Sequence, residues 1–178
     1  RNDKNKTKSI LSNGIIICSI LGLILTALVL IFKPIIYYMG QPEIVVSLAY
    51  PYITLVAISL FPLIIFQSFK QFSDGLSFTK IAMISTVIAN IINVVLNYIL
   101  IYGEFGFPRL ELVGAGIGTL ISRFIMVLLI IYLIKSNPKT NQYINNLFSF
   151  EYSSKIIKKI FNIGYPSALQ MMLSLIHI

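Results

Sequence analysis

Residues 90–123 read NIINVVLNYILIYGEFGFPRLELVGAGIGTLISR, two apolar segments separated by a short glycine-rich turn. The first segment carries Asn90, Asn93 and Asn97, whose spacing places them on one face of a helix. An asparagine amide is costly in hydrocarbon, so this stripe predicts an interior that is lined by protein or by water. We therefore expect the functional site on this face.

The composition of the chain is typical of integral membrane proteins. Hydrophobic residues make up 57% of it, charged residues only 11%, and its mean hydropathy is +0.86. Its long uncharged runs can each cross about 30 Å of hydrocarbon as a helix that rises about 1.5 Å per residue. The four complete spans that we predict are residues 11–32, 47–69, 81–102 and 112–134. The expected fold class is all-α, a polytopic membrane helical bundle.

The two ends of the chain resemble cuts through a longer protein. The chain begins at Arg1 in a hydrophilic stretch, and a fifth apolar run starts near Ile160 and stops at Ile178 before a crossing is complete. We therefore expect a fragment with four complete spans and a truncated fifth. Residues 173–178 (LSLIHI) resemble a translated sequencing adaptor, so they are interpreted as an artefact that includes His177.

Basic residues are distributed unequally between the two sides of the predicted bundle. Most of the 14 Lys and Arg flank one side: Arg1, Lys4, Lys6, Lys8, Lys70, Lys80, Lys135, Lys139, Lys155, Lys158 and Lys159. The other side holds only Lys33 and Arg109, and this excess predicts that the N-terminal flank is cytoplasmic. The net charge of +8 is therefore a feature of membrane topology, and no nucleic-acid partner is expected.

The longest polar segment lies after the fourth predicted span. We expect residues 135–159 to form a cytoplasmic connector between two halves of a larger bundle. Enzyme motifs are lacking in the sequence, which has no P-loop, no pair of carboxylates within a span and no cluster of Cys and His. The sequence therefore predicts a protein that is not an enzyme and that draws its energy from an ion gradient.

Four sequence motifs follow one another in a distinctive order. They are FKQFSDGLSFTK at residues 69–80, NVVLNYILIYG at 93–103, GFPRLELVGAGIGT at 106–119 and NIGYPSALQMML at 162–173. In this order and spacing the chain resembles the multidrug and toxic compound extrusion (MATE) transporters, and the resemblance covers essentially all of residues 1–172. Such transporters contain repeated helical bundles with a site near the membrane midplane.

The resemblance implies a place for each part of the chain in a two-bundle transporter. Residues 1–134 would supply the third to sixth helices of the N-terminal bundle, and residues 160–172 would begin the C-terminal bundle. The implied function is a secondary antiporter that exports amphipathic or cationic drugs in exchange for Na⁺ or H⁺ by alternating access. The implied protein is a monomer in the bacterial inner membrane, with lipid, organic substrate and coupling cation as its partners and no other cofactor.

The resemblance also implies a cation site between the two helices of residues 90–123. In the family, the corresponding positions bind a coupling cation, and here they are Asn93, Asn97, the backbone oxygen of Ala115 and Thr119. Asn97 is neutral where cation-binding members often carry Asp, so one negative charge of a Na⁺ site is absent. Because hard cations prefer oxygen ligands and carboxylates above all, we expect a weaker site here. Either the first helix of the family's bundle supplies the acid, or the main coupling site lies in the other half of the transporter.

Four further residues are candidates for the lining of a cavity: Thr86, Asn90, Tyr98 and Arg123. Arg123 lies deep in its span, where a guanidinium needs an acid, a carbonyl or water as partner. We expect it to fix the position of its helix rather than to contact substrate. The simpler interpretation of the asparagine face is hydrogen bonding between helices, worth about 1 kcal/mol per side chain.

Two alternative functions are compatible with the sequence. A lipid-linked oligosaccharide flippase of the same wider superfamily would share the bundle, but it would need more cationic residues to meet a pyrophosphate, and only Arg123 qualifies inside the spans. A membrane scaffold without transport activity would use its intramembrane polar residues for packing alone.

Overall fold

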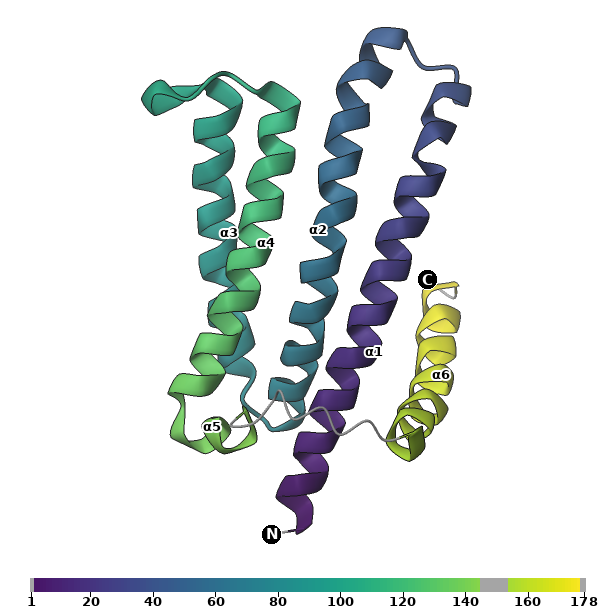
Figure 1. Cartoon of the computed structure of the whole chain (residues 1–178), viewed down its shortest axis with the longest axis vertical. Coiled ribbons are helices and arrows are strands. Elements are labelled where there is room, and N and C mark those ends of the chain that lie inside the picture. Colours follow the sequence, from purple (N-terminus) through teal and green to yellow (C-terminus); the bar gives the residue numbers. More distant parts are fainter. Residues whose placement is uncertain (1, 145–153, 177–178) are drawn as a thin grey trace.

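The computed structural model describes residues 2–144 and 154–176, and every regular element in those ranges is helical (Figure 1). The four long helices are α1 (Asn2–Phe32), α2 (Glu43–Gly75), α3 (Thr79–Tyr102) and α4 (Glu111–Ser136). The two shorter helices are α5 (Pro138–Ile144) and α6 (Ser154–Ile176). The 3-10 helix η1 (Lys33–Tyr38) extends α1, and η2 (Glu104–Gly106) lies in the turn between α3 and α4. The expected all-α fold is confirmed.

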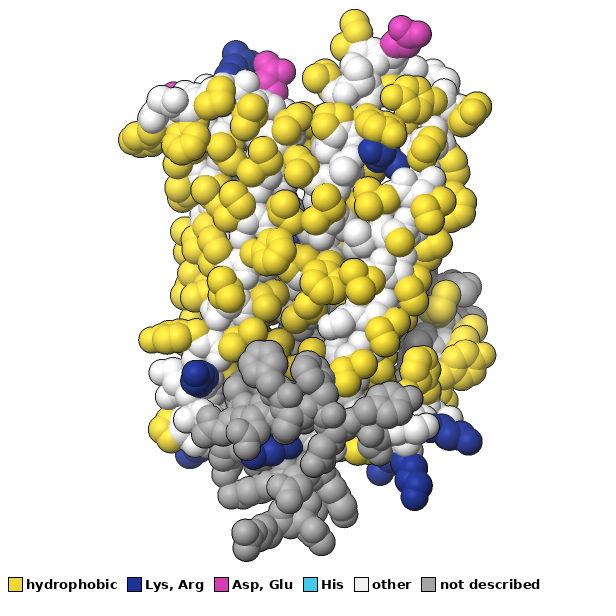
Figure 2. All heavy atoms as spheres, in the orientation of Figure 1, with side chains coloured by type: hydrophobic (Ala, Val, Ile, Leu, Met, Phe, Trp, Pro, Cys, Tyr) yellow, Lys and Arg dark blue, Asp and Glu magenta, His cyan; other side chains and the backbone are white. Residues whose placement is uncertain are grey.

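Four helices in the described ranges are long and apolar enough to cross a membrane, namely α1 with η1, α2, α3 and α4. Each of the predicted spans lies inside one of them. Large apolar side chains cover the outer faces of these helices, as shown by Ile31, Val94 and Leu128, which are 69%, 68% and 65% exposed. Figure 2 shows this apolar surface between two charged ends. Such a surface is stable against lipid, so the chain is a multi-pass integral membrane protein.

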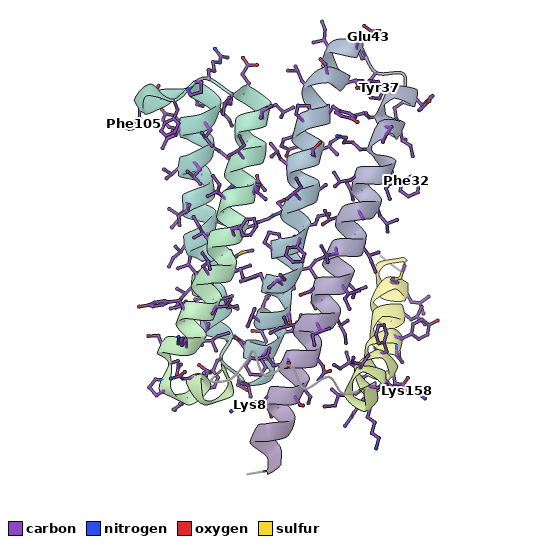
Figure 3. All side chains as sticks on the ribbon, viewed as in Figure 1. Lys8, Phe32, Tyr37, Glu43, Phe105 and Lys158 are labelled. Carbon is purple, nitrogen blue, oxygen red and sulfur yellow. The ribbon has the colours of Figure 1, made fainter. Side chains whose placement is uncertain are left out.

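The two ends of the bundle differ in charge, since basic side chains predominate at one end and the other carries both signs (Figure 2). Lys8 and Lys158 lie toward the end at which the chain begins, whereas Glu43 lies at the opposite end with Tyr37 and Phe105 (Figure 3). Aromatic side chains are common where a helix leaves the hydrocarbon. The predicted orientation in the membrane depends on this distribution of charged residues, and it stays a prediction.

The helix α4 occupies a central place in the bundle. It packs against α3 and α2, while α1 packs against the far side of α2 and α6 lies beside α1 (Figure 1). An apolar core lies toward the end of the bundle at which the chain begins, where Phe66 and Phe69 of α2 meet Met126 and the fully buried Ile130 of α4. This packing leaves a common space between α2, α3 and α4 beside the core, since Phe66 and Met126 contribute to both.

Glycines at the beginning of α4 let it approach its neighbours closely. A Cβ added at Gly114 would lie 2.6 Å from the backbone oxygen of Leu100 in α3, which is far inside van der Waals contact. A Cβ at Gly118 would overlap the side-chain oxygen of Asn97, and Gly116 faces α2 instead. Small residues therefore set the distance between these helices, as is typical of helix pairs in membranes.

The predicted connector contains a short helix that packs against the end of α4. Thr140 of α5 is fully buried, and its hydroxyl donates a hydrogen bond of 2.6 Å to the backbone oxygen of Ile134. Residues 145–153 of the connector lie outside the described residues, as does His177 of the suspected artefact. The helix α6 begins at Ser154, before the apolar run that starts near Ile160, because it extends into the basic flank.

Candidate functional site

A cavity of about 370 Å³ lies between α2, α3 and α4. Each helix contributes residues at spacings of three and four, so each presents one face to the cavity. The lining consists of Leu63, Phe66, Gln67 and Lys70 of α2, Thr86, Ala89, Asn90 and Asn93 of α3, and Thr119, Ser122, Arg123 and Met126 of α4. Polar and apolar side chains are therefore mixed in a space that lies within the membrane-spanning helices.

The structure brings most of the predicted site residues together. Five candidates line the cavity: Thr86, Asn90, Asn93, Thr119 and Arg123. Asn97 and Ala115 lie one helical turn farther from it and are joined to it by hydrogen bonds. Tyr98 is not among the lining residues, because its ring is 56% exposed and packs 5.4 Å from the ring of Tyr102, centroid to centroid.

One hydrogen-bonded network joins α3 to α4 at this point. The amide of Asn97 donates to the side-chain oxygen of Asn93 at 3.2 Å, and the amide of Asn93 donates to the hydroxyl of Ser122 at 3.0 Å. Ser122 donates in turn to the backbone oxygen of Thr119 at 3.0 Å, and the Thr119 hydroxyl donates to the backbone oxygen of Ala115 at 2.8 Å. The four positions implied by the resemblance therefore form one network.

One oxygen of this network has no hydrogen-bond partner among the described residues. It is Oδ1 of Asn97, which is buried beside Gly118. A buried polar atom that lacks a partner costs about 1–3 kcal/mol, so it is a natural place for a ligand. An amide oxygen is the neutral, hard ligand that Na⁺ accepts, whereas the backbone oxygen of Ala115 already accepts a hydrogen bond from the Thr119 hydroxyl.

The charge of the cavity lining is positive. Arg123 and Lys70 line the cavity, and no carboxylate is found among its described lining residues. Likewise, no group of three or more His, Cys, Asp or Glu occurs in the part of the chain that the structure describes. The oxygen network can therefore ligate a cation only through neutral groups, unless a carboxylate reaches it from elsewhere.

Arg123 links α4 to α2 through a neutral partner. Its Nη1 donates a hydrogen bond of 2.6 Å to the hydroxyl of Ser59, which is fully buried and donates to the backbone oxygen of Val56 at 2.7 Å. Hydrogen bonds from charged donors are about twice as strong as neutral ones. The contact agrees with the expectation that this arginine fixes the position of its helix.

We expect a Ser59→Ala substitution to lower the stability of the bundle by about 1.5 kcal/mol, because it removes the acceptor of a charged hydrogen bond. The measurement is the thermal unfolding temperature of the protein in a neutral detergent. Ser47→Ala is the matched control, since the exposed Ser47 hydroxyl of the same helix bonds only to the backbone oxygen of Ile44. Equal unfolding temperatures for the two variants would show that the contact with Arg123 adds nothing.

Some residues of the cavity were not singled out in the sequence. Gln67 and Lys70 share one face of α2 with Leu63. Their spacing predicts that they share a face, but not that this face meets the cavity, which depends on the helix opposite. Ser122 follows Thr119 by three residues and so lies on the same face of α4. Lys70 was assigned to the basic flank, and the structure adds that its half-buried side chain lines the cavity.

Together these features define a polytopic helical bundle of the membrane that encloses a polar cavity. The sequence model of the MatE family matches residues 1–99. The chain is 32% identical over 177 residues to the "Probable multidrug resistance protein NorM" of Photorhabdus laumondii, a match that covers 99% of this chain and 38% of that protein. It is 30% identical over 156 residues to the "Multidrug resistance protein NorM" of Vibrio cholerae, which covers 87% of this chain and 34% of that protein. The chain belongs to the MatE family.

Solved structures show the same likeness. An inward-facing multidrug resistance MATE family transporter of the MOP superfamily has a TM-score of 0.79 and 28% identity, covering 94% of this chain and 37% of the other. A MATE protein in the bent conformation has a TM-score of 0.72 and 28% identity, covering 93% and 40%. The chain thus spans little more than a third of the length of the NorM relatives. The MATE-type helical bundle expected from the sequence is confirmed.

Proposed function

We propose that the chain forms part of the N-terminal bundle of a secondary active exporter. The exporter moves amphipathic organic compounds, cationic drugs among them, in exchange for Na⁺ or H⁺. The observation that carries this proposal is the polar cavity between α2, α3 and α4 inside an apolar bundle of the MATE type. Polar residues that face an intramembrane cavity typically mark the path of a substrate or an ion. Relatives named for multidrug resistance support the same class of cargo.

The proposed mechanism depends on residues that belong to both the cavity and the oxygen network. Asn93 and Thr119 line the cavity and are also members of the network that includes Asn97. A cargo and a cation that both need these side chains disfavour each other. The cargo then stabilises one orientation of the bundles, and the cation stabilises the other. Because the two ligands shift the population of orientations in opposite directions, the protein exchanges cargo for cation.

Neutral oxygens favour Na⁺ over H⁺ as the ion at this network. We propose that Na⁺ is ligated by Asn93, Asn97, the backbone oxygen of Ala115 and Thr119, with the unpartnered Oδ1 of Asn97 as its first ligand. Amide and carbonyl oxygens bind Na⁺ but do not hold a proton near neutral pH. A carboxylate in the part of the protein beyond these residues would strengthen the site, and proton coupling would require one.

The proposed location is the bacterial inner membrane, with the N-terminal flank in the cytoplasm and a monomer as the working unit. Cysteine labelling tests the orientation in a background where Cys18, the single cysteine of residues 1–178, and any cysteine beyond them are replaced by serine. Met39 is 64% exposed in the turn after η1, and Lys80 is exposed at the opposite end. In intact cells we expect an impermeant thiol reagent to label Met39→Cys and to spare Lys80→Cys. The reverse pattern would invert the topology.

Transport is tested with the complete coding sequence in a bacterial host that lacks its own major efflux pumps. We expect the protein to lower the accumulation of a fluorescent amphipathic dye several-fold, and collapse of the Na⁺ gradient to abolish the effect. Normal membrane insertion without any efflux would instead favour the scaffold. A flippase of lipid-linked oligosaccharides is the second candidate, because Lys70 adds a second cation to the lining of the cavity.

A further inference from the structure

We propose that the cavity between α2, α3 and α4 binds an anionic group of its amphipathic cargo, with Lys70 and Arg123 as the cationic partners. This inference rests on the proposed function and deepens it, because it names the chemistry of one part of the cargo. A carboxylate or a phosphate monoester attached to an apolar body is the class of molecule that fits.

The cavity carries two positive charges without a counter-charge among its described lining residues. Lys70 of α2 and Arg123 of α4 line the same cavity from different helices. Within the described residues the ammonium of Lys70 makes neither a hydrogen bond nor an ion pair, and Arg123 donates only to the neutral hydroxyl of Ser59. Two like charges beside a low-dielectric interior repel each other, and their desolvation is unfavourable. An anion between them relieves both effects.

The remaining lining of the cavity also suits an anionic group on an apolar body. The side-chain amides of Gln67 and Asn90 supply neutral N–H donors on the same cavity, which suits an anionic oxygen. Phe66 and Met126 supply apolar walls for the body to which that oxygen is attached. A volume of about 370 Å³ lies at the lower end of the range for small-molecule pockets. The cavity therefore suits a head group with a small ring system.

Lys70 and Arg123 lie at different depths in the bundle. Lys70 lies five residues before the end of α2 at Gly75, which is about 8 Å along the helix axis, whereas Arg123 is about 18 Å from either end of α4. The two cations therefore mark a path from the membrane edge to its middle. An anionic group that entered beside Lys70 would be drawn onward to Arg123, because clefts lined by one sign of charge concentrate the opposite sign.

Two other lysines at the same end of the bundle differ from Lys70 in their position. Lys80 is the second residue of α3 and is exposed, and Lys135 lies in the last turn of α4. Neither lysine lines the cavity. A lysine that serves membrane orientation alone has no reason to turn into a cavity. The position of Lys70 thus requires a separate explanation, and Lys80 provides a matched control.

The test uses two dyes that differ in one group: rhodamine 110 carries a free carboxylate, and rhodamine 123 is its cationic methyl ester. Binding is measured by fluorescence anisotropy on the protein from the complete coding sequence, held in phosphatidylcholine nanodiscs. We expect the carboxylate dye to bind at least tenfold more tightly than the ester. Lys70→Gln should weaken binding of the carboxylate dye about tenfold and change that of the ester less than twofold. Lys70→Arg should restore it.

Lys80→Gln should leave the affinity for both dyes within twofold of the wild type. Equal affinities of the wild type for the two dyes would overturn the proposal, as would equal effects of Lys70→Gln and Lys80→Gln. Addition of phosphatidylglycerol to the nanodiscs separates the two sources of the anionic group. Displacement of the carboxylate dye supports the site with a lipid headgroup as its occupant, and retention of the dye supports it with soluble cargo.

An efflux measurement with the same dyes separates failure of this inference from failure of the proposed function. Export of the ester without preference for the carboxylate dye would overturn the anionic site and leave the exporter in place. Export of neither dye at normal expression would contradict the proposed function itself. Arg123→Lys is the variant for the second cation, since it keeps the charge beside Ser59 while losing the forked geometry of the guanidinium.

Discussion

A Gly114→Ala substitution is expected to push α4 away from α3 and to cost about 2 kcal/mol of stability, the range for an overpacked interface. The added Cβ would lie 2.6 Å and 2.7 Å from the backbone oxygen and carbon of Leu100. Backbone atoms within a helix cannot rotate aside as the end of a flexible side chain can. The same Leu100 oxygen also accepts a hydrogen bond of 3.0 Å from the backbone N–H of Leu110, so a displaced α4 disturbs the turn as well.

The thermal unfolding temperature in detergent measures this effect, together with the yield of monodisperse protein. Gly164→Ala is the matched control, because Gly164 lies inside α6 and a Cβ there meets nothing within 4 Å. Alanine is the better helix former by about 1 kcal/mol, so this control should be neutral or stabilising. Unfolding temperatures that shift alike in both variants would mean that close backbone approach does not limit the packing of α4.

An Asn97→Asp substitution is expected to lower the Na⁺ concentration for half-maximal efflux by about tenfold, equal to about 1.4 kcal/mol. Asp has nearly the same shape as Asn and places a charged oxygen at the buried, unpartnered Oδ1 position beside Gly118. A carboxylate is the stronger ligand for a hard cation. Asn97→Ala removes the ligand altogether, and we expect it to abolish the dependence of efflux on Na⁺.

Dye efflux against external Na⁺, at matched expression of the variants, measures both effects. Asn141→Asp serves as control, since Oδ1 of Asn141 is also buried without a hydrogen-bond partner among the described residues but belongs to α5, away from the network. Unchanged Na⁺-coupled efflux in Asn97→Ala would return the network to an interhelical role worth about 1 kcal/mol per side chain.

The membrane spans could be predicted from the sequence because hydrocarbon imposes a length and an apolar composition on each of them. The predicted spans are shorter than the helices at several ends. The helix α1 begins at Asn2 and α6 at Ser154, in polar flanks where water rather than lipid surrounds the backbone. Apolar runs mark the hydrocarbon, not the limits of hydrogen bonding along a helix.

The asparagine face was also readable, because residues three and four apart share a face whatever lies opposite. Thr86, Asn90 and Asn93 accordingly line the cavity together. Tyr98 does not, because it follows Asn97 directly and successive residues point about 100° apart around a helix. Tyr98 is therefore adjacent to Asn97 in the sequence but does not share the face of α3 that carries the asparagines.

The residues that α2 contributes to the cavity could not be predicted from the sequence, for a different reason. Whether Lys70 faces lipid, headgroups or a cavity depends on which side of α2 meets α4, and this pairing is not encoded in spacing along one helix. The hydrogen bond from Arg123 to Ser59 likewise joins residues 64 positions apart. Contacts of this kind follow from packing, which small residues such as Gly116 determine only once all three helices are assembled.

Under the proposed function, the double membership of Asn93 and Thr119 has a consequence for how the transporter adapts. A mutation that reshapes the pocket for a new toxin at either position also alters the atoms proposed to hold the driving ion. Broader resistance gained there should be accompanied by a changed salt requirement for growth in the presence of that toxin. Thr86 and Asn90 line the cavity outside the network. Substitutions at these two positions should change the selectivity for substrates without changing the coupling ion.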